Sequence, residues 1–179
     1  RVIALVDLPF ASKGDKGGYI ESEKNLSHKG NSWVGDNACV FEDAYVSGNA
    51  QVYDNAEISE NAQVYDYAVV YDDAKVSGEA KVYGEAKVYG SARIREAACV
   101  FDNADVYEYA IISGKARVYG DSLIYGNANV FGYAHVAENA KVYGNSEVCG
   151  GAVIYGGAKV YGDSEVYGRA QVFGRAQVY

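Results

Sequence analysis

The chain lacks several features that mark common protein classes. It has no methionine, one proline, one tryptophan and three cysteines among 179 residues. Three cysteines are too few for a disulfide framework, so we expect a reducing compartment and a cytoplasmic protein. No apolar run reaches the length of a membrane-spanning helix, and no charged segment followed by an apolar one predicts a secretory leader. We therefore expect no membrane partner.

Positive charge is also scarce. The formal net charge is −8, which argues against direct binding of nucleic acid. The charge is uneven, because residues 1–35 carry +1, residues 36–108 carry −10 and residues 109–179 carry +1. A solvated, solubilising surface explains the acidic middle. The alternative is an acidic mimic or inhibitor that occupies the basic groove of a nucleic-acid-handling protein, with partner-binding residues Asp54, Asp66 and Asp72.

The dominant pattern is a repeat of six residues. It begins at Asn31 and continues to Tyr179 without insertion or deletion, as in Glu79-Ala-Lys-Val-Tyr-Gly84. The second position of each hexad is Ala or Ser, and the fourth is Val or Ile. These two side chains alternate with period two, so they point to one face of a short strand. Gly, Asn, Asp and Glu dominate the sixth and first positions, and a tight corner follows each strand.

The fifth position of the hexad indicates how many hexads make one coil. Every third hexad carries a similar residue there, so we predict three hexads, or 18 residues, per coil and about eight coils. One series is tyrosine throughout, the second is almost wholly aromatic, and the third is mixed and partly polar. The first series consists of Tyr53, Tyr71, Tyr89, Tyr107, Tyr125, Tyr143, Tyr161 and Tyr179. The prediction is an all-β fold, a single-stranded, three-sided parallel β-helix with a stacked tyrosine ladder on one edge.

The hexad resembles the hexapeptide repeat of left-handed parallel β-helix proteins, and this resemblance implies the left-handed sense. The opening of the chain is similar to that of the YdcK-like group, on Arg1-Val-Ile-Ala-Leu-Val-Asp7, Lys13-Gly-Asp-Lys-Gly-Gly-Tyr-Ile20, Asn25-Leu-Ser27 and Gly30-Asn-Ser-Trp-Val34. The resemblance implies a hexapeptide-repeat acyltransferase that uses acyl-CoA at a site between subunits. Such enzymes usually extrude a loop from a coil near a catalytic histidine, and residues 31–179 contain no such loop.

Residues 1–30 precede the repeat and do not follow its pattern. We therefore divide the single domain into a capping segment at 1–30 and a β-helix at 31–179. Val2–Leu8 is an apolar run that predicts a strand, which Pro9 ends. Glu21–Leu26 is a short polar stretch that predicts a turn of helix. The first coil of a solenoid exposes apolar interior and strand edges, so a cap is expected there.

Few residues suggest chemistry. His135 is the one histidine of the repeat and occupies the outward third position, so it is the catalytic base if the chain is an acyltransferase. Otherwise it is a solvated side chain. Cys39, Cys99 and Cys149 lie in separate coils and predict neither a disulfide nor a metal site. Asp36, Asp54 and Asp72 stack at one corner, which corner propensity explains; a cation between their carboxylates is the alternative.

The preferred interpretation is a non-catalytic binding or scaffolding module. It presents rigid walls to a protein partner or to further copies of itself, and we expect a homo-oligomer without a cofactor. The acyltransferase with acyl-CoA and the acidic mimic stay open as alternatives.

Overall fold

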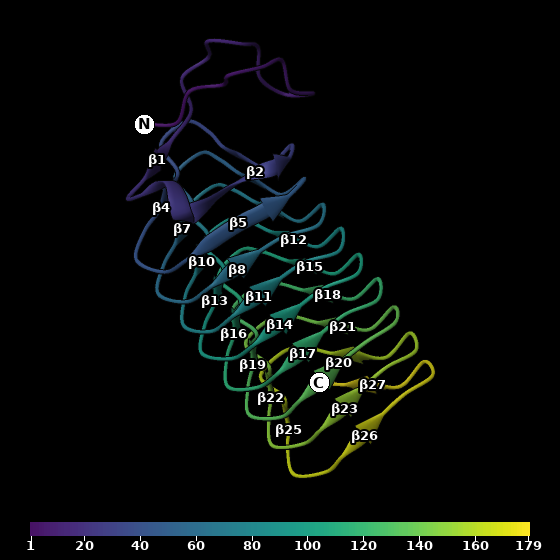
Figure 1. Ribbon diagram of the computed structural model, residues 1–179. Helices are drawn as coiled ribbons and strands as arrows, with labels where there is room; N and C mark the ends of the chain where they lie inside the picture. The colour runs from purple at the N-terminus through teal and green to yellow at the C-terminus, as the bar shows by residue number, and fades with distance from the viewer.

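The computed structural model describes residues 1–179 as a parallel β-solenoid with three flat walls (Figure 1). The two ends of the chain lie at opposite ends of the rod. Each strand pairs in parallel with the strand that comes three strands later in the chain, as β12 (Lys87–Val88) does with β15 (Asp105–Val106). The predicted coil of three hexads and 18 residues is therefore confirmed.

Each wall is a sheet of nine parallel strands, and we call the three sheets walls A, B and C. Wall A contains β1 (Tyr19–Ile20), β4 (Cys39–Val40), β7 (Glu57–Ile58), β10 (Lys75–Val76), β13 (Arg93–Ile94), β16 (Ile111–Ile112), β19 (Asn129–Val130), β22 (Glu147–Val148) and β25 (Glu165–Val166). Wall B contains β2 (Leu26–Gly30), β5 (Tyr45–Gly48), β8 (Gln63–Val64), β11 (Lys81–Val82), β14 (Cys99–Val100), β17 (Arg117–Val118), β20 (His135–Val136), β23 (Val153–Ile154) and β26 (Gln171–Val172). Wall C contains β3 (Trp33–Val34), β6 (Gln51–Val52), β9 (Val69–Val70), β12, β15, β18 (Leu123–Ile124), β21 (Lys141–Val142), β24 (Lys159–Val160) and β27 (Gln177–Val178).

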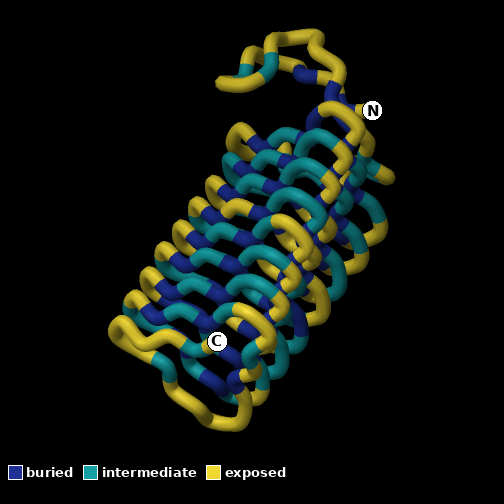
Figure 2. The backbone as a smooth tube through the Cα atoms, turned by 180° about the vertical axis from the view of Figure 1, so that it is seen from behind, coloured by how far each residue is buried: buried dark blue, intermediate teal, exposed yellow.

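The core consists of the second and fourth residues of the hexads. One cluster of 43 buried residues, almost all Ala, Val and Ile, runs along the axis. Figure 2 shows buried positions recurring along each coil between exposed corners. Ile58, Ile94 and Ile112 are among the largest side chains that are fully buried. Each such side chain contributes about 1.5–3 kcal/mol when it leaves water.

Hydrogen bonds join every coil to the next. The N–H groups of Gln51 and Tyr53 donate to the carbonyl groups of Ala68 and Val70, at 3.0 and 3.1 Å, and this pattern repeats in all three walls. Because the strands of each wall run parallel and pair with residues 18 positions later, each corner lies directly above its counterpart in the neighbouring coil. Identical positions of the hexad therefore form rows along the rod.

Side chains at the fifth position line three edges, named after the walls they join. On edge CA, the eight predicted tyrosines stack in one ladder with ring centroids 4.8–5.7 Å apart and rings within 22° of parallel. On edge BC, a second ladder runs from Tyr65 to Tyr119 with centroids 4.8–4.9 Å apart. Ala137 interrupts it, and it resumes with Tyr155 and Phe173 at 5.3 Å. Edge AB carries no such ladder.

Residues 18–35 form a ninth coil, of which the hexad pattern marks only the last strand, β3. β1 pairs with β4, and β2 pairs with β5 through an irregular register. The predicted helical turn is a 3-10 helix, η1 (Glu23–Asn25). Asn25 is fully buried, and its side-chain amide donates to the carbonyl groups of Glu42 and Ala44, both at 2.9 Å. Because this coil is held by a buried amide and pairs with the next coil through an irregular register, it escapes a search for hexads.

Residues 2–17 form a hairpin that projects beyond the first coil (Figure 1). The prediction of a strand over Val2–Leu8 is wrong, because the segment makes only isolated antiparallel bridges, Ile3 with Lys16 and Leu8 with Ala11. The carboxylate of Asp7 accepts the N–H of Lys13 at 2.8 Å, which turns the chain around Pro9 before a ladder can form. A helix long and apolar enough to cross a bilayer does not occur in the structure.

Candidate functional site

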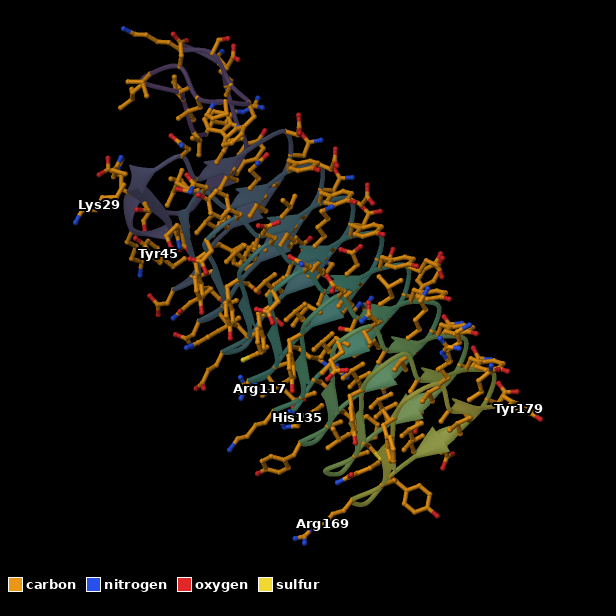
Figure 3. The ribbon with its side chains drawn as sticks, turned by 90° about the vertical axis from the view of Figure 1, so that its right-hand side faces the viewer. Lys29, Tyr45, Arg117, His135, Arg169 and Tyr179 are labelled. Carbon is orange, nitrogen blue, oxygen red and sulfur yellow. The ribbon has the colours of Figure 1, made fainter.

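His135 lies on the outer face of wall B in strand β20. Its register neighbours are Arg117 and Val153, as the hexad pattern predicts, and Figure 3 shows the Arg117 and His135 side chains side by side. The imidazole ring meets the ring of Tyr119 edge-on, with centroids 6.4 Å apart. Partial burial, and next to it the charge of Arg117, lower the pKa of His135, so the ring is neutral at pH 7.

The surroundings of His135 do not provide a partner for proton transfer. No hydrogen bond reaches its ring from another side chain. The carboxylate of Glu138, which is closest in sequence, accepts the backbone N–H of Gly156 at 3.0 Å instead. A catalytic histidine is usually held by a hydrogen bond to its second nitrogen. In this structure a base at His135 would depend on a bound acceptor for orientation.

The three aspartates of the predicted partner surface do not form one cluster. Asp54 and Asp72 lie one coil apart on edge CA, whereas Asp66 lies on edge BC. The Asp54 carboxylate accepts the N–H of Asp72 at 3.3 Å. Asp66 and Asp72 accept the N–H groups of Gly84 and Gly90, at 3.3 and 3.0 Å. Each carboxylate therefore joins its own corner to the corner of the next coil.

This arrangement is general at the sixth position of the hexad. Ten acidic residues adopt a left-handed backbone there, with φ between 49° and 60°. Nine of them accept the N–H of the residue 18 positions later, and Glu60 is the exception. We call these nine residues the corner acids: Asp36, Glu42, Asp54, Asp66, Asp72, Glu96, Asp102, Glu108 and Glu138. An ionised acceptor makes a stronger hydrogen bond than a neutral one, so each corner acid links two coils.

Sequence reasoning identified corner propensity at Asp36, Asp54 and Asp72, and their positive φ confirms it. It missed the hydrogen bond from the next coil. The available signal was the alternation of Asp or Glu with Gly at one hexad position, since a carboxylate side chain, unlike glycine, can accept the N–H group that lies one coil ahead. One oxygen of each of these three carboxylates, Oδ2, is engaged with the backbone of the next coil.

The cysteines lie far apart in the rod. Cys39 is on wall A, Cys99 is on wall B and Cys149 is on edge AB, and all three are free thiols. Burial, followed by the charges of Glu147 and Glu165, raises the pKa of Cys149, which disfavours the nucleophilic thiolate. The structure contains no group of three His, Cys, Asp or Glu side chains placed to hold a metal ion.

The hairpin and the first coil border an open hollow. Its volume is about 420 Å³, and its wall includes Ile3, Leu5, Val6, Leu26 and Trp33. Of these lining residues, Ile3, Leu5 and Val6 are 53%, 72% and 62% exposed. Large apolar side chains that are exposed together usually mark an interaction surface.

Comparison with known families agrees with the fold. Residues 50–66 match a family described as the YdcK beta solenoid repeat. A search of curated proteins found no significant match. The matched repeat and the three-walled coil fit a hexapeptide-repeat β-helix protein of the YdcK type.

Proposed function

We propose that this β-solenoid is a non-catalytic binding module that pairs with a second copy of itself through the N-terminal hairpin. The exposure of Ile3, Leu5 and Val6 carries the proposal. Burying these three side chains against a matching surface would remove their apolar area from water, which is the main source of affinity between subunits.

The backbone of the hairpin also supports pairing. Val2 and Ala4 use their N–H and carbonyl groups within the hairpin, bonding to Gly17, Gly18, Asp15 and Gly14. The alternate residues Ile3 and Leu5 make no backbone hydrogen bonds. Their N–H and carbonyl groups form a free edge, and such an edge accepts an added strand. Two antiparallel copies of this edge are self-complementary about a two-fold axis.

Charge favours a second copy at the hairpin over one at the walls. Residues 1–35 carry +1, whereas residues 36–108 carry −10. Two copies that met along their acidic coils would repel each other, because like charges across an interface cost affinity. Contact through the hairpin keeps those coils apart.

Sedimentation velocity across a concentration series tests the proposal. Wild type is expected to form a dimer, and Leu5→Asp is expected to remain monomeric, because a buried unpaired charge is costly. Tyr109→Asp is the matched control, since Tyr109 is 66% exposed but lies on edge CA. A monomeric wild type, or equal loss of the dimer in both variants, would overturn the proposal.

The two sequence-derived alternatives have their own tests. An acyltransferase with His135 as base predicts thermal stabilisation by acetyl-CoA that His135→Ala removes. A mimic predicts salt-sensitive binding to a nucleic-acid-handling protein that the triple change of Asp54, Asp66 and Asp72 to Asn weakens. Asn keeps an acceptor oxygen for the N–H of the next coil, so lost binding in that variant would reflect lost charge.

A further inference from the structure

Edge AB differs from the other two edges in the size of its side chains. Between Phe41 and Phe131 its fifth positions carry small or cationic residues, namely Ser59, Ser77, Arg95 and Ser113. Rings fill the corresponding places on edges CA and BC. Here a hollow of about 280 Å³ remains, lined by Lys75, Ser77, Arg93, Ile94 and Arg95. We call it the arginine hollow.

The cations of the arginine hollow come from two adjacent coils. Lys75 and Arg93 are register partners on the outer face of wall A. Arg95 follows Arg93 by two residues in the same hexad, and Ser77 stands in the same place after Lys75. All three cationic side chains are exposed, so their charged groups can meet a ligand that enters from solvent.

Two of the three cations have no counter-ion in the protein. Lys75 pairs with Glu57 at 2.7 Å, and the one other ion pair of the structure joins Lys24 to Asp43. Arg93 and Arg95 therefore have no carboxylate within ion-pair distance. The nearest acid in sequence, Glu96, accepts the N–H of Gly114 at 2.8 Å and so lies along the axis. The hollow thus presents two uncompensated guanidinium groups inside the stretch of the chain that carries −10.

We propose that the arginine hollow binds the phosphate group of a phosphomonoester. Such a group carries about −1.5 to −2 at pH 7, which matches the two uncompensated charges. The planar guanidinium groups suit tetrahedral oxyanions, because each can donate two parallel hydrogen bonds. The Ser77 hydroxyl supplies a further donor, and Lys75 adds a point charge at the rim.

Calorimetric titration at low salt tests this inference, with inorganic phosphate and methyl phosphate as probes and acetate as the monoanion control. Both phosphates are expected to saturate wild type, with acetate far weaker. Arg93→Gln and Arg95→Ser are each expected to weaken binding about tenfold, since each removes a charge-assisted donor pair. Arg95→Ser restores the residue found at this position one coil away on either side, so the fold tolerates it.

Lys141→Gln is the matched control. Lys141 and Lys159 are also register partners, but they lie on wall C without a row of serines beside them. This variant is expected to bind phosphate as wild type does. Unchanged binding in Arg95→Ser, an equal loss in Lys141→Gln, or the absence of saturation in wild type would each overturn the site. Binding of inorganic phosphate without methyl phosphate would overturn the assignment to a monoester.

Discussion

The coils over residues 36–108 and the coils over residues 109–179 have the same left-handed backbone at their corners but different residue types there. In the first region, nine acidic residues adopt a positive φ, and in the second only Glu138 does. The second region relies on glycine, which adopts this conformation without steric cost. The corner glycines of the hexad repeat have φ between 66° and 77°, whereas the acids lie between 49° and 60°. One backbone shape is therefore reached by two kinds of residue.

The comparison explains the uneven charge of the chain. Nine of the 15 acids in residues 36–108 occupy left-handed corners, where a side chain costs about 1 kcal/mol of backbone strain. The hydrogen bond to the next coil offsets that cost. Glycine corners avoid the strain and leave the next N–H to water. The acidic middle thus has a structural source, independent of any partner.

The largest effect is expected where a glycine corner of the hexad repeat is most crowded. A Cβ added at Gly78 would lie 2.6–2.8 Å from backbone atoms of Glu96, whereas one added at Gly162 would meet nothing within 4 Å. Gly78→Val should lower the free energy of unfolding by about 3 kcal/mol, through crowding and strain together. Gly162→Val should cost about 1–2 kcal/mol from strain alone. Urea denaturation measures both, and equal losses would show that crowding between coils is unimportant.

An acidic corner should respond in graded steps. Glu108 accepts the N–H of Gly126 at 2.9 Å with φ of 57°. Glu108→Ala loses the bond but keeps the strain, so we expect a loss of about 2 kcal/mol. Glu108→Gly relieves the strain and should lose less than 1 kcal/mol, and Glu108→Gln keeps an acceptor and should be nearly neutral. If Gly proved worse than Ala at this position, strain would not be part of the account.

The tyrosine ladder crosses both regions, and its response to alkali reports on the acidic one. Burial, followed by the charge of Asp105 and the neighbouring rings, raises the pKa of Tyr89 to about 12. The folded state holds this proton more tightly than the unfolded state, so the stabilisation is complete below pH 10. It is lost as the pH rises towards 12, by about 1 kcal/mol after solvent screening. The phenolate absorbance of wild type should exceed that of Tyr89→Phe by a step centred near pH 12, and a step centred near pH 10 would contradict the assignment.

The smallest effect concerns an acid that is not at a corner. Asp105 lies on the outer face of wall C, and burial raises its pKa while Lys87 opposes the rise. The folded state therefore binds the proton more tightly, and stability falls as the pH rises through that pKa. Asp105→Asn should gain about 0.5 kcal/mol at pH 7 and lose the gain below about pH 4. Thermal melts at the two pH values measure it, and a destabilised variant at pH 7 would contradict the sign.

Much of the fold was predictable because each hexad repeats the same residue pattern, which specifies one short strand and one corner. Alternating Ala and Val fixed the inner face, and the 18-residue spacing of Tyr89 and Tyr107 fixed the coil. The coil at residues 18–35 was not predictable, because buried Asn25 bonds to the neighbouring coil through its side-chain amide, and the asparagines of the hexads are not buried. The left-handed sense stays an expectation from the resemblance.

The candidate sites were harder to predict from the sequence than the fold was. The outward direction of His135 and its neighbours Arg117 and Val153 followed from strand register. The separation of Asp66 from Asp54 and Asp72 also follows from the register, but their bonds to the next coil require knowing that a corner N–H faces each carboxylate. The arginine hollow was hidden, because it depends on the space beside the small side chain of Ser77 in the neighbouring coil.

Amide hydrogen exchange, followed by nuclear magnetic resonance, tests most directly whether the corner acids join successive coils. The N–H groups of Gly84, Gly90, Gly114, Gly120, Gly126 and Gly156 each donate to a corner acid. The glycines at Gly132, Gly144 and Gly150 follow a glycine corner and have no such acceptor. We predict slow exchange for the first group and fast exchange for the second. Equal rates in the two groups would contradict the account.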